Sequence, residues 1–299
     1  MIPSSVQVKL EDFDTLFVGH PVDIERNLTA LLTQADSLPD KSLYIQILSQ
    51  IALAQAMQQR FAEAHQTLDH AESHIAAGHE LARARVILER GRVFHQAGHP
   101  AEALPLFEAS YALSSSHRFD FHTVNAAHMA AIVSKNVDDK IAWNTRAIEL
   151  AADPSGRAHA WMGALSNNLA QNYIEAGRFS DALATFKQCQ LYGEQRGDAI
   201  VVRGAKWGIG RALRPLGRLD DALQIQLGLL EEYTGIESRG ELPAELIAVG
   251  RGMIHEELAE IHLAYANTFA ALAYRELCND PWFGKLEPAR LERLKRGYV

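Results

Sequence analysis

The chain has 299 residues, of which 47% are hydrophobic and 22% are charged, and its formal net charge is -8. The hydrophobic content is too high for a disordered chain, and the negative charge argues against nucleic-acid binding, which needs a basic surface. Two cysteines are too few for a disulfide framework. We see no signal peptide and no apolar run near the roughly 20 residues that span a bilayer. The expected location is therefore cytoplasmic, with no membrane segment.

In chain order, residues 1–20 are predicted to be an irregular lead-in, and helices are expected to alternate over residues 21–278. Residues that favour turns separate these helices at positions 38–40, 98–100, 153–156, 177–178 and 217–218. A longer loop is predicted over residues 234–243, because this stretch holds Gly235 and Gly240. Residues 279–299 are predicted to be a C-terminal capping segment, and a basic interaction tail is the alternative.

A pattern of small, aromatic, Gly, Ala, large apolar and small residues returns about every forty residues along the chain. The two clearest copies have offsets of 3, 7, 12, 16 and 19, and they are Gly91, Phe94, Gly98, Ala103, Phe107, Ser110 and Ala170, Tyr173, Gly177, Ala182, Phe186, Cys189. Weaker copies surround Ala64 and Ala222. In the first, Gln55 and Gln59 replace the aromatic residue and the Gly. In the second, Gln226 and Leu229 replace the expected aromatic and small residues of the second helix. A degenerate copy over residues 132–152 places Lys140, Asn144 and Ala147 on a second helix.

These residues resemble the tetratricopeptide repeat, a helix–turn–helix unit in which a small residue lets two helices approach and an aromatic residue packs beside it. The period near forty is similar to that of the longer-helix subclass of kinesin light chains and several bacterial regulators. The resemblance implies an all-α fold, a right-handed superhelical solenoid of antiparallel helix pairs. About six to seven pairs would form one continuous domain over residues 21–278.

No catalytic, cofactor or metal site is predicted. His70/His74 and His95/His99 have the i, i+4 spacing that places two imidazoles on one helix face, but no further ligand follows at a suitable spacing. The Gly208-Ile209-Gly210 stretch lacks the preceding strand of a dinucleotide-binding motif. We therefore expect a protein that is not an enzyme.

In tetratricopeptide superhelices, one stripe of each first helix lines a concave groove that holds extended peptides. Carried onto this sequence, the resemblance implies a peptide- or partner-binding row, which we call the predicted binding row: Arg85, Arg92, His95, Asn125, Asn167, Gln171, Trp207, Arg211 and Arg214. An asparagine amide can donate to and accept from a peptide backbone, and an arginine fork suits a carboxylate. The stripe contains no carboxylate itself, so the expected partner has acidic character.

The favoured hypothesis is an adaptor or regulator that binds an extended acidic or carboxylate-bearing peptide, or a partner helix. The alternatives are a sensor that closes around a small anion or peptide signal, and a self-assembling scaffold. A structural interpretation of the same residues also stays open: the arginines would pair with Glu108, Asp220 or Asp221 on second helices, and Trp207 would lie in the core. The sequence leaves the partner, the oligomeric state and a lid role for residues 234–243 undecided.

Overall fold

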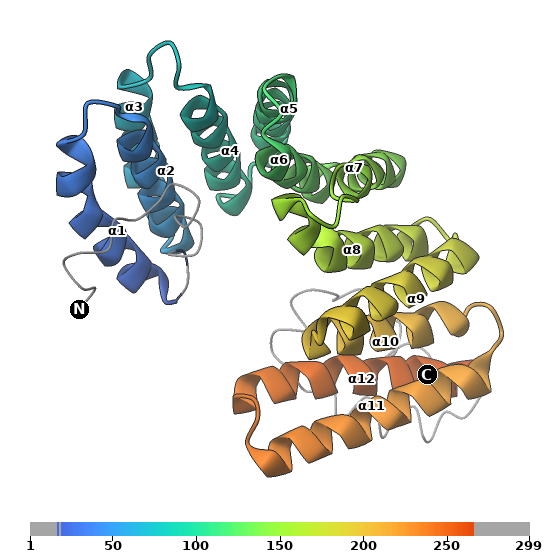
Figure 1. Ribbon diagram of the computed structural model, residues 1–299. Helices are drawn as coiled ribbons and strands as arrows, with labels where there is room; N and C mark the ends of the chain where they lie inside the picture. The colour runs from blue at the N-terminus through green and yellow to red at the C-terminus, as the bar shows by residue number, and fades with distance from the viewer. Residues whose placement is uncertain (1–16, 18, 266–299) are drawn as a thin grey trace. The chain divides into compact units, whose positions relative to one another are not determined.

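The computed structural model describes residue 17 and residues 19–265, and every regular element in this part of the chain is a helix. The chain divides at Trp161/Met162 into two compact units, which are described separately (Figure 1). The predictions made for residues 1–16 and 266–299, including the capping segment, lie outside the described residues. A single continuous repeat domain over residues 21–278 stays a prediction.

Unit 1 consists of helix pairs in which each first helix packs on the second helix that follows it. The first helices are α2, α4 and α6, and α1 packs on α2 ahead of them (Figure 1). The bounds are α1 Pro21–Asp36, α2 Ser42–Met57, α3 Phe61–Ser73, α4 Glu80–Gln96, α5 Pro100–Ser116, α6 Asp120–Val133, α7 Val137–Leu150 and the short 3-10 helix η2 Arg157–Trp161.

Within unit 2 the helices also pack as pairs, and α9, α11 and α12 are longer than any helix of unit 1 (Figure 1). Its first helices are α8, α10 and α12, and α10 lies in contact with both of the others. The bounds are α8 Met162–Glu175, α9 Phe179–Arg196, α10 Ala199–Leu213, α11 Leu219–Arg239 and α12 Ala244–Ala264. No helix in the described part of the chain is both long and apolar enough to cross a membrane.

The predicted turn glycines end the first helices. Gly177 has a φ of 71°, in the left-handed region that glycine adopts without strain. The amide of Arg178 then donates to the carbonyl of Tyr173 at 2.8 Å, which closes the end of α8. In the first complete pair, Gln59 stands at the glycine position and still has a φ of 62°. The fold therefore imposes the same reversal on a residue that is poorly suited to it.

The predicted second-helix residues form the core between the helices. Ala103, Phe107, Ala182 and Phe186 are all fully buried. A Cβ atom at Gly91 would lie 2.6 Å from Cε1 of Phe107, so the small residue predicted at this crossing is required by packing.

The last small position of the pattern makes a polar contact that the pattern did not predict. Ser110 Oγ donates to the carbonyl of Ala84 at 2.9 Å, and Cys189 Sγ donates to the carbonyl of Gly163 at 3.4 Å. The two contacts span the same sequence separation of 26 residues in different units. A buried hydroxyl or thiol at this position therefore ties a second helix to the backbone of its first helix.

The loop predicted over residues 234–243 is mostly helix. Helix α11 runs to Arg239, and Gly240 ends it with a φ of 65°. Gly235 lies inside the helix, where a glycine costs only about 1 kcal/mol and does not by itself break a long helix. The prediction was therefore wrong for residues 234–239, and the connection to α12 spans residues 240–243.

Candidate functional site

In unit 1, polar side chains on α2 and α4 lie side by side between the two helices. Gln46 Oε1 accepts from Arg85 Nη1 at 3.3 Å, and Gln50 Nε2 donates to Glu89 Oε1 at 2.9 Å. Both pairs are separated by 39 residues, one period of the repeat. Successive first helices therefore run parallel, with equivalent positions adjacent. Arg85 is only 5% exposed, so it belongs to the packing between helices as much as to any surface.

Arg92 connects this contact to α6. Its Nη1 lies 3.4 Å from Oε2 of Glu89, and its Nη2 donates to Oδ1 of Asn125 at 2.6 Å. The side chain of Arg92 is 18% exposed, whereas Glu89 is 2% and Asn125 is 7% exposed. The structure thus brings two members of the predicted binding row together, with the arginine as the more accessible one.

A buried histidine lies next to this contact. His128 lies on α6, and its ring centroid lies 5.3 Å from that of Trp161. Burial lowers the pKa of His128 to about 4, and the positive charge of Arg92 adds to this effect. His95, the remaining member of the row in unit 1, is half-buried, and burial lowers its pKa as well. Both imidazoles are therefore held in the neutral form at neutral pH.

In unit 2, Arg211 links α8 with α10. Its Nη1 donates to Oε1 of Gln171 at 2.9 Å, across 40 residues of sequence. Its Cζ atom lies 5.1 Å from the centroid of the Trp207 ring, within range of a cation–π interaction. The guanidinium of Arg211 is thus held by an amide on one helix and an indole on its own helix.

Trp207 itself lies in the core of unit 2. It is 9% exposed and packs against Leu229, Ile254 and Leu258. Its Nε1 donates to the carbonyl of Met253 at 3.1 Å. The indole therefore has the packing role that the structural interpretation of the sequence described, and it also supports Arg211.

Carboxylates lie closer to the arginines than the sequence suggested. Arg214 Nε donates to Oε1 of Glu257 at 2.6 Å, and Nη1 lies 3.4 Å from Oε2 of Glu260. Both glutamates are on α12, where the repeat frame was too irregular to assign a stripe. Glu89 was missed because it lies on α4 outside the stripe positions. The stripe positions themselves carry no carboxylate, but carboxylates at other positions lie against their arginines.

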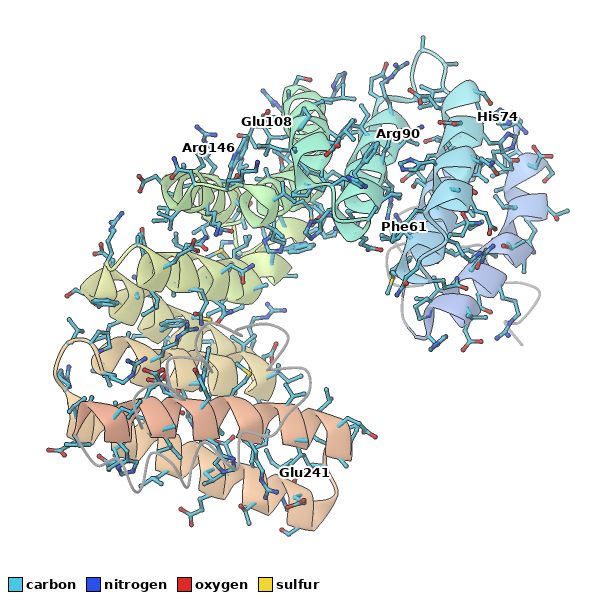
Figure 2. The ribbon with its side chains drawn as sticks, turned by 180° about the vertical axis from the view of Figure 1, so that it is seen from behind. Phe61, His74, Arg90, Glu108, Arg146 and Glu241 are labelled. Atoms are coloured by element: carbon cyan, nitrogen blue, oxygen red, sulfur yellow. The ribbon has the colours of Figure 1, made fainter. Side chains whose placement is uncertain are left out.

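Two of the second-helix carboxylates have other contacts, since the hydroxyl of Tyr265 donates to Asp220 and Arg218 pairs with Asp221 at 2.6 Å at the start of α11. Glu108 is exposed on α5 (Figure 2). Arg90 of α4 is labelled in Figure 2, and it pairs with Asp69 of α3 at 2.8 Å. Surface ion pairs of this kind contribute under about 1 kcal/mol each.

Asn167 is half-buried on α8. It lies in unit 2 and Asn125 lies in unit 1, so the two asparagines that the repeat pattern makes equivalent belong to separate units. Whether both contact one ligand stays a prediction.

The described residues include no group of three or more His, Cys, Asp or Glu side chains placed to hold a metal ion. The His70 and His74 rings lie 4.8 Å apart, and His70 Nε2 is hydrogen-bonded to the hydroxyl of Tyr44 at 3.0 Å. Cys189 is buried, and burial raises the pKa of its thiol to about 11, which keeps it protonated.

No protein-family model matches this sequence, and no curated protein matches it. Solved structures do match it. Nearly identical TPR-like repeats from Podosopora anserina, assigned to a kinesin light chain, share 19% identity over 66% of this chain and 93% of that chain, with a TM-score of 0.52. The apo form of RapI shares 10% identity over 90% of this chain and 92% of that chain, with a TM-score of 0.62.

NprR in complex with its cognate peptide NprX shares 13% identity over 96% of this chain and 81% of that chain, with a TM-score of 0.57. At such identities the likeness concerns the fold. The all-α fold of this protein is that of the tetratricopeptide-repeat solenoids, as the residue pattern predicted.

Proposed function

We propose that this protein is a non-enzymatic interaction module, an adaptor or regulator, that binds an extended peptide or partner helix along the first helices of its repeats. The observation that carries the proposal is the contact of Arg92 with Asn125, which joins an anion-binding group and a backbone-binding group on neighbouring first helices. Arg211 and Gln171 repeat this combination in unit 2. The partner is an acidic segment, because a guanidinium fork binds a carboxylate with two parallel hydrogen bonds.

The comparison with NprR supports this proposal, since that protein was crystallised with its cognate peptide. A fold of this kind can therefore present a peptide-binding surface. The net charge of -8 disfavours nucleic acid as the partner. No cofactor is required by the proposed function.

The test is selection of binders from a random peptide library displayed on phage, with the full chain as the target. Wild-type protein is expected to enrich peptides that carry Asp or Glu. An Arg92→Gln, Arg211→Gln double variant is expected to lose that enrichment, because the glutamine amide cannot supply a charged fork. Arg85 is left unchanged, since it is buried and hydrogen-bonded to Gln46.

The matched control is Arg83→Gln, which removes one exposed guanidinium from α4. Its enrichment is expected to equal that of the wild type. The proposed function fails if wild-type protein selects no peptide family. The assignment of the binding surface fails if the double variant and the wild type select the same peptides equally well.

A small-anion sensor is the second candidate, and the position of Arg211 over the Trp207 ring favours it. An anion that binds Arg211 would alter the surroundings of this indole and hence its fluorescence. Titration with inorganic phosphate or citrate is expected to change tryptophan emission, and a Trp207→Phe variant should remove the change. A response to peptides alone would reject this candidate.

A further inference from the structure

We infer that Arg92 and Asn125 form a coupled recognition site in unit 1 for a peptide that carries an Asp or Glu side chain next to an extended backbone. The ligand carboxylate takes the guanidinium away from Asn125, and the released amide then binds the peptide backbone. This inference rests on the proposed function and specifies the ligand chemistry of one part of the same surface.

Asn125 is already engaged by the guanidinium of Arg92. Its Oδ1 accepts from Nη2 of Arg92 at 2.6 Å, a short distance for an N–H···O bond. With 7% of the residue exposed, the amide offers almost no surface to a peptide in this arrangement. Arg92 is the more exposed partner, so an incoming anion meets the guanidinium first.

Glu89 competes with Asn125 for the guanidinium of Arg92. Glu89 lies 3.4 Å from Nη1, a longer contact than the one to Asn125. Glu89 also accepts from Gln50 Nε2 at 2.9 Å, which holds the carboxylate between α2 and α4. Because Glu89 is buried and held in this way, it cannot follow the guanidinium outward. Glu89 therefore competes with the ligand for the guanidinium of Arg92, and a ligand acceptor must bind this group strongly enough to overcome that competition.

A carboxylate and an amide differ as acceptors for the guanidinium of Arg92. A hydrogen bond from a guanidinium to a carboxylate is roughly twice as strong as one between neutral groups. A ligand carboxylate can therefore displace the neutral amide of Asn125, whereas a neutral ligand amide gains nothing by the exchange. The guanidinium has five N–H donors, so it can keep part of its contact with Glu89 while it binds the ligand.

The consequence is energetic coupling between carboxylate recognition and backbone recognition. Once Arg92 has turned to the ligand, the amide of Asn125 can accept from a peptide N–H and donate to a peptide C=O. A peptide without the acidic residue meets an asparagine that is still occupied. The acidic residue should therefore be required before Asn125 contributes to affinity.

The experiment is a thermodynamic cycle on the full chain. The probes are a synthetic peptide from the phage selection and its counterpart in which the acidic residue is replaced by the matching amide. For wild-type protein, the replacement should weaken binding about tenfold. Asn125→Ala should weaken binding of the acidic peptide by a similar factor, and binding of the amide peptide by less than about twofold.

If Asn125→Ala weakens both peptides by the same factor, the two contacts are independent and the inference is wrong. Peptide binding, and with it the proposed function, would still stand. A second variant decides the question should Asn125→Ala fold poorly, as judged by circular dichroism and melting. Glu89→Gln keeps the shape and the acceptor for Gln50 but removes the competing charge.

Glu89→Gln should tighten binding of the acidic peptide about threefold or more and leave the amide peptide unchanged. In an Arg92→Gln background the same substitution should have no effect. Equal effects with and without Arg92 would show that the ligand carboxylate does not draw this guanidinium away from its internal partners, and would overturn the coupled site.

Discussion

Ser110 and Cys189 occupy the same structural position in two different units, each donating a hydrogen bond to a first-helix carbonyl 26 residues earlier. Both residues are buried. A small side chain with one donor therefore suits the position, whether that donor is a hydroxyl or a thiol. Because the two positions are equivalent, the serine found at position 110 should also be tolerated at position 189.

Cys189→Ser is expected to change the free energy of unfolding by less than about 1 kcal/mol, because the hydroxyl keeps the donor. Cys189→Leu should cost about 1 to 3 kcal/mol, because the larger side chain overpacks a closed position. Urea unfolding followed by circular dichroism measures both. A serine variant as unstable as the leucine variant would contradict the equivalence with Ser110.

The close approach of Phe186 to Gly208 predicts opposite effects for the same substitution on one helix. A Cβ atom at Gly208 would lie 2.2 Å from Cε1 of the fully buried Phe186, so Gly208→Ala should destabilise unit 2 by about 1 to 3 kcal/mol. Gly204, also on α10, has no atom within 4 Å of such a Cβ. Gly204→Ala should stabilise by up to about 1 kcal/mol through helix propensity. Thermal unfolding of the two variants in parallel tests both signs.

The backbone of Gln59 predicts a stabilising substitution. Its φ of 62° is costly for a residue with a Cβ, so Gln59→Gly should stabilise by about 1 kcal/mol or slightly less. Gly177→Ala introduces the reverse change at an equivalent turn with a φ of 71°, and should destabilise by a similar amount. Denaturant midpoints compare the pair. A destabilised Gln59→Gly variant would show that the glutamine side chain contributes more than the backbone costs.

His128 predicts a loss of stability in mild acid. Its pKa is about 4 in the folded protein, below the ordinary value of 6.5, so the unfolded state binds more protons between these values. The contribution of neutral His128 to the free energy of unfolding is fully present above about pH 6.5 and is lost as the pH falls toward about 4. Its size is at most about 3 kcal/mol.

The measurement is urea unfolding across this pH range for the wild type and for His128→Gln, in which the amide does not titrate. The variant should show a flatter dependence of the free energy of unfolding on pH. The matched control is His99→Gln, which makes the same substitution at an exposed position. If the free energy of unfolding depends on pH in the same way for all three proteins, protonation of His128 does not cause the loss of stability in acid.

Much of the fold was determined by the sequence alone. The repeated spacing of small, aromatic and turn residues predicted the helix pairs, because each pattern position is fixed by contacts within a pair or with the next one. Ala103, Phe107, Ala182 and Phe186 are buried as this predicts. Local composition was a weaker guide at residues 234–239, since one glycine does not end a long helix that packs on its neighbours.

The candidate site shows where sequence patterns stop being sufficient. The stripe placed Arg92 and Asn125, or Arg211 and Gln171, on facing first helices, and the repeat period explains why they meet. Which atom donates to which, and which carboxylates intervene, depended on packing between helices. Glu89 and Glu257 are outside the stripe in sequence, and only the tertiary structure brought them against the arginines. Helical periodicity assigns a side chain to a face, whereas side-chain partners are chosen by geometry and burial.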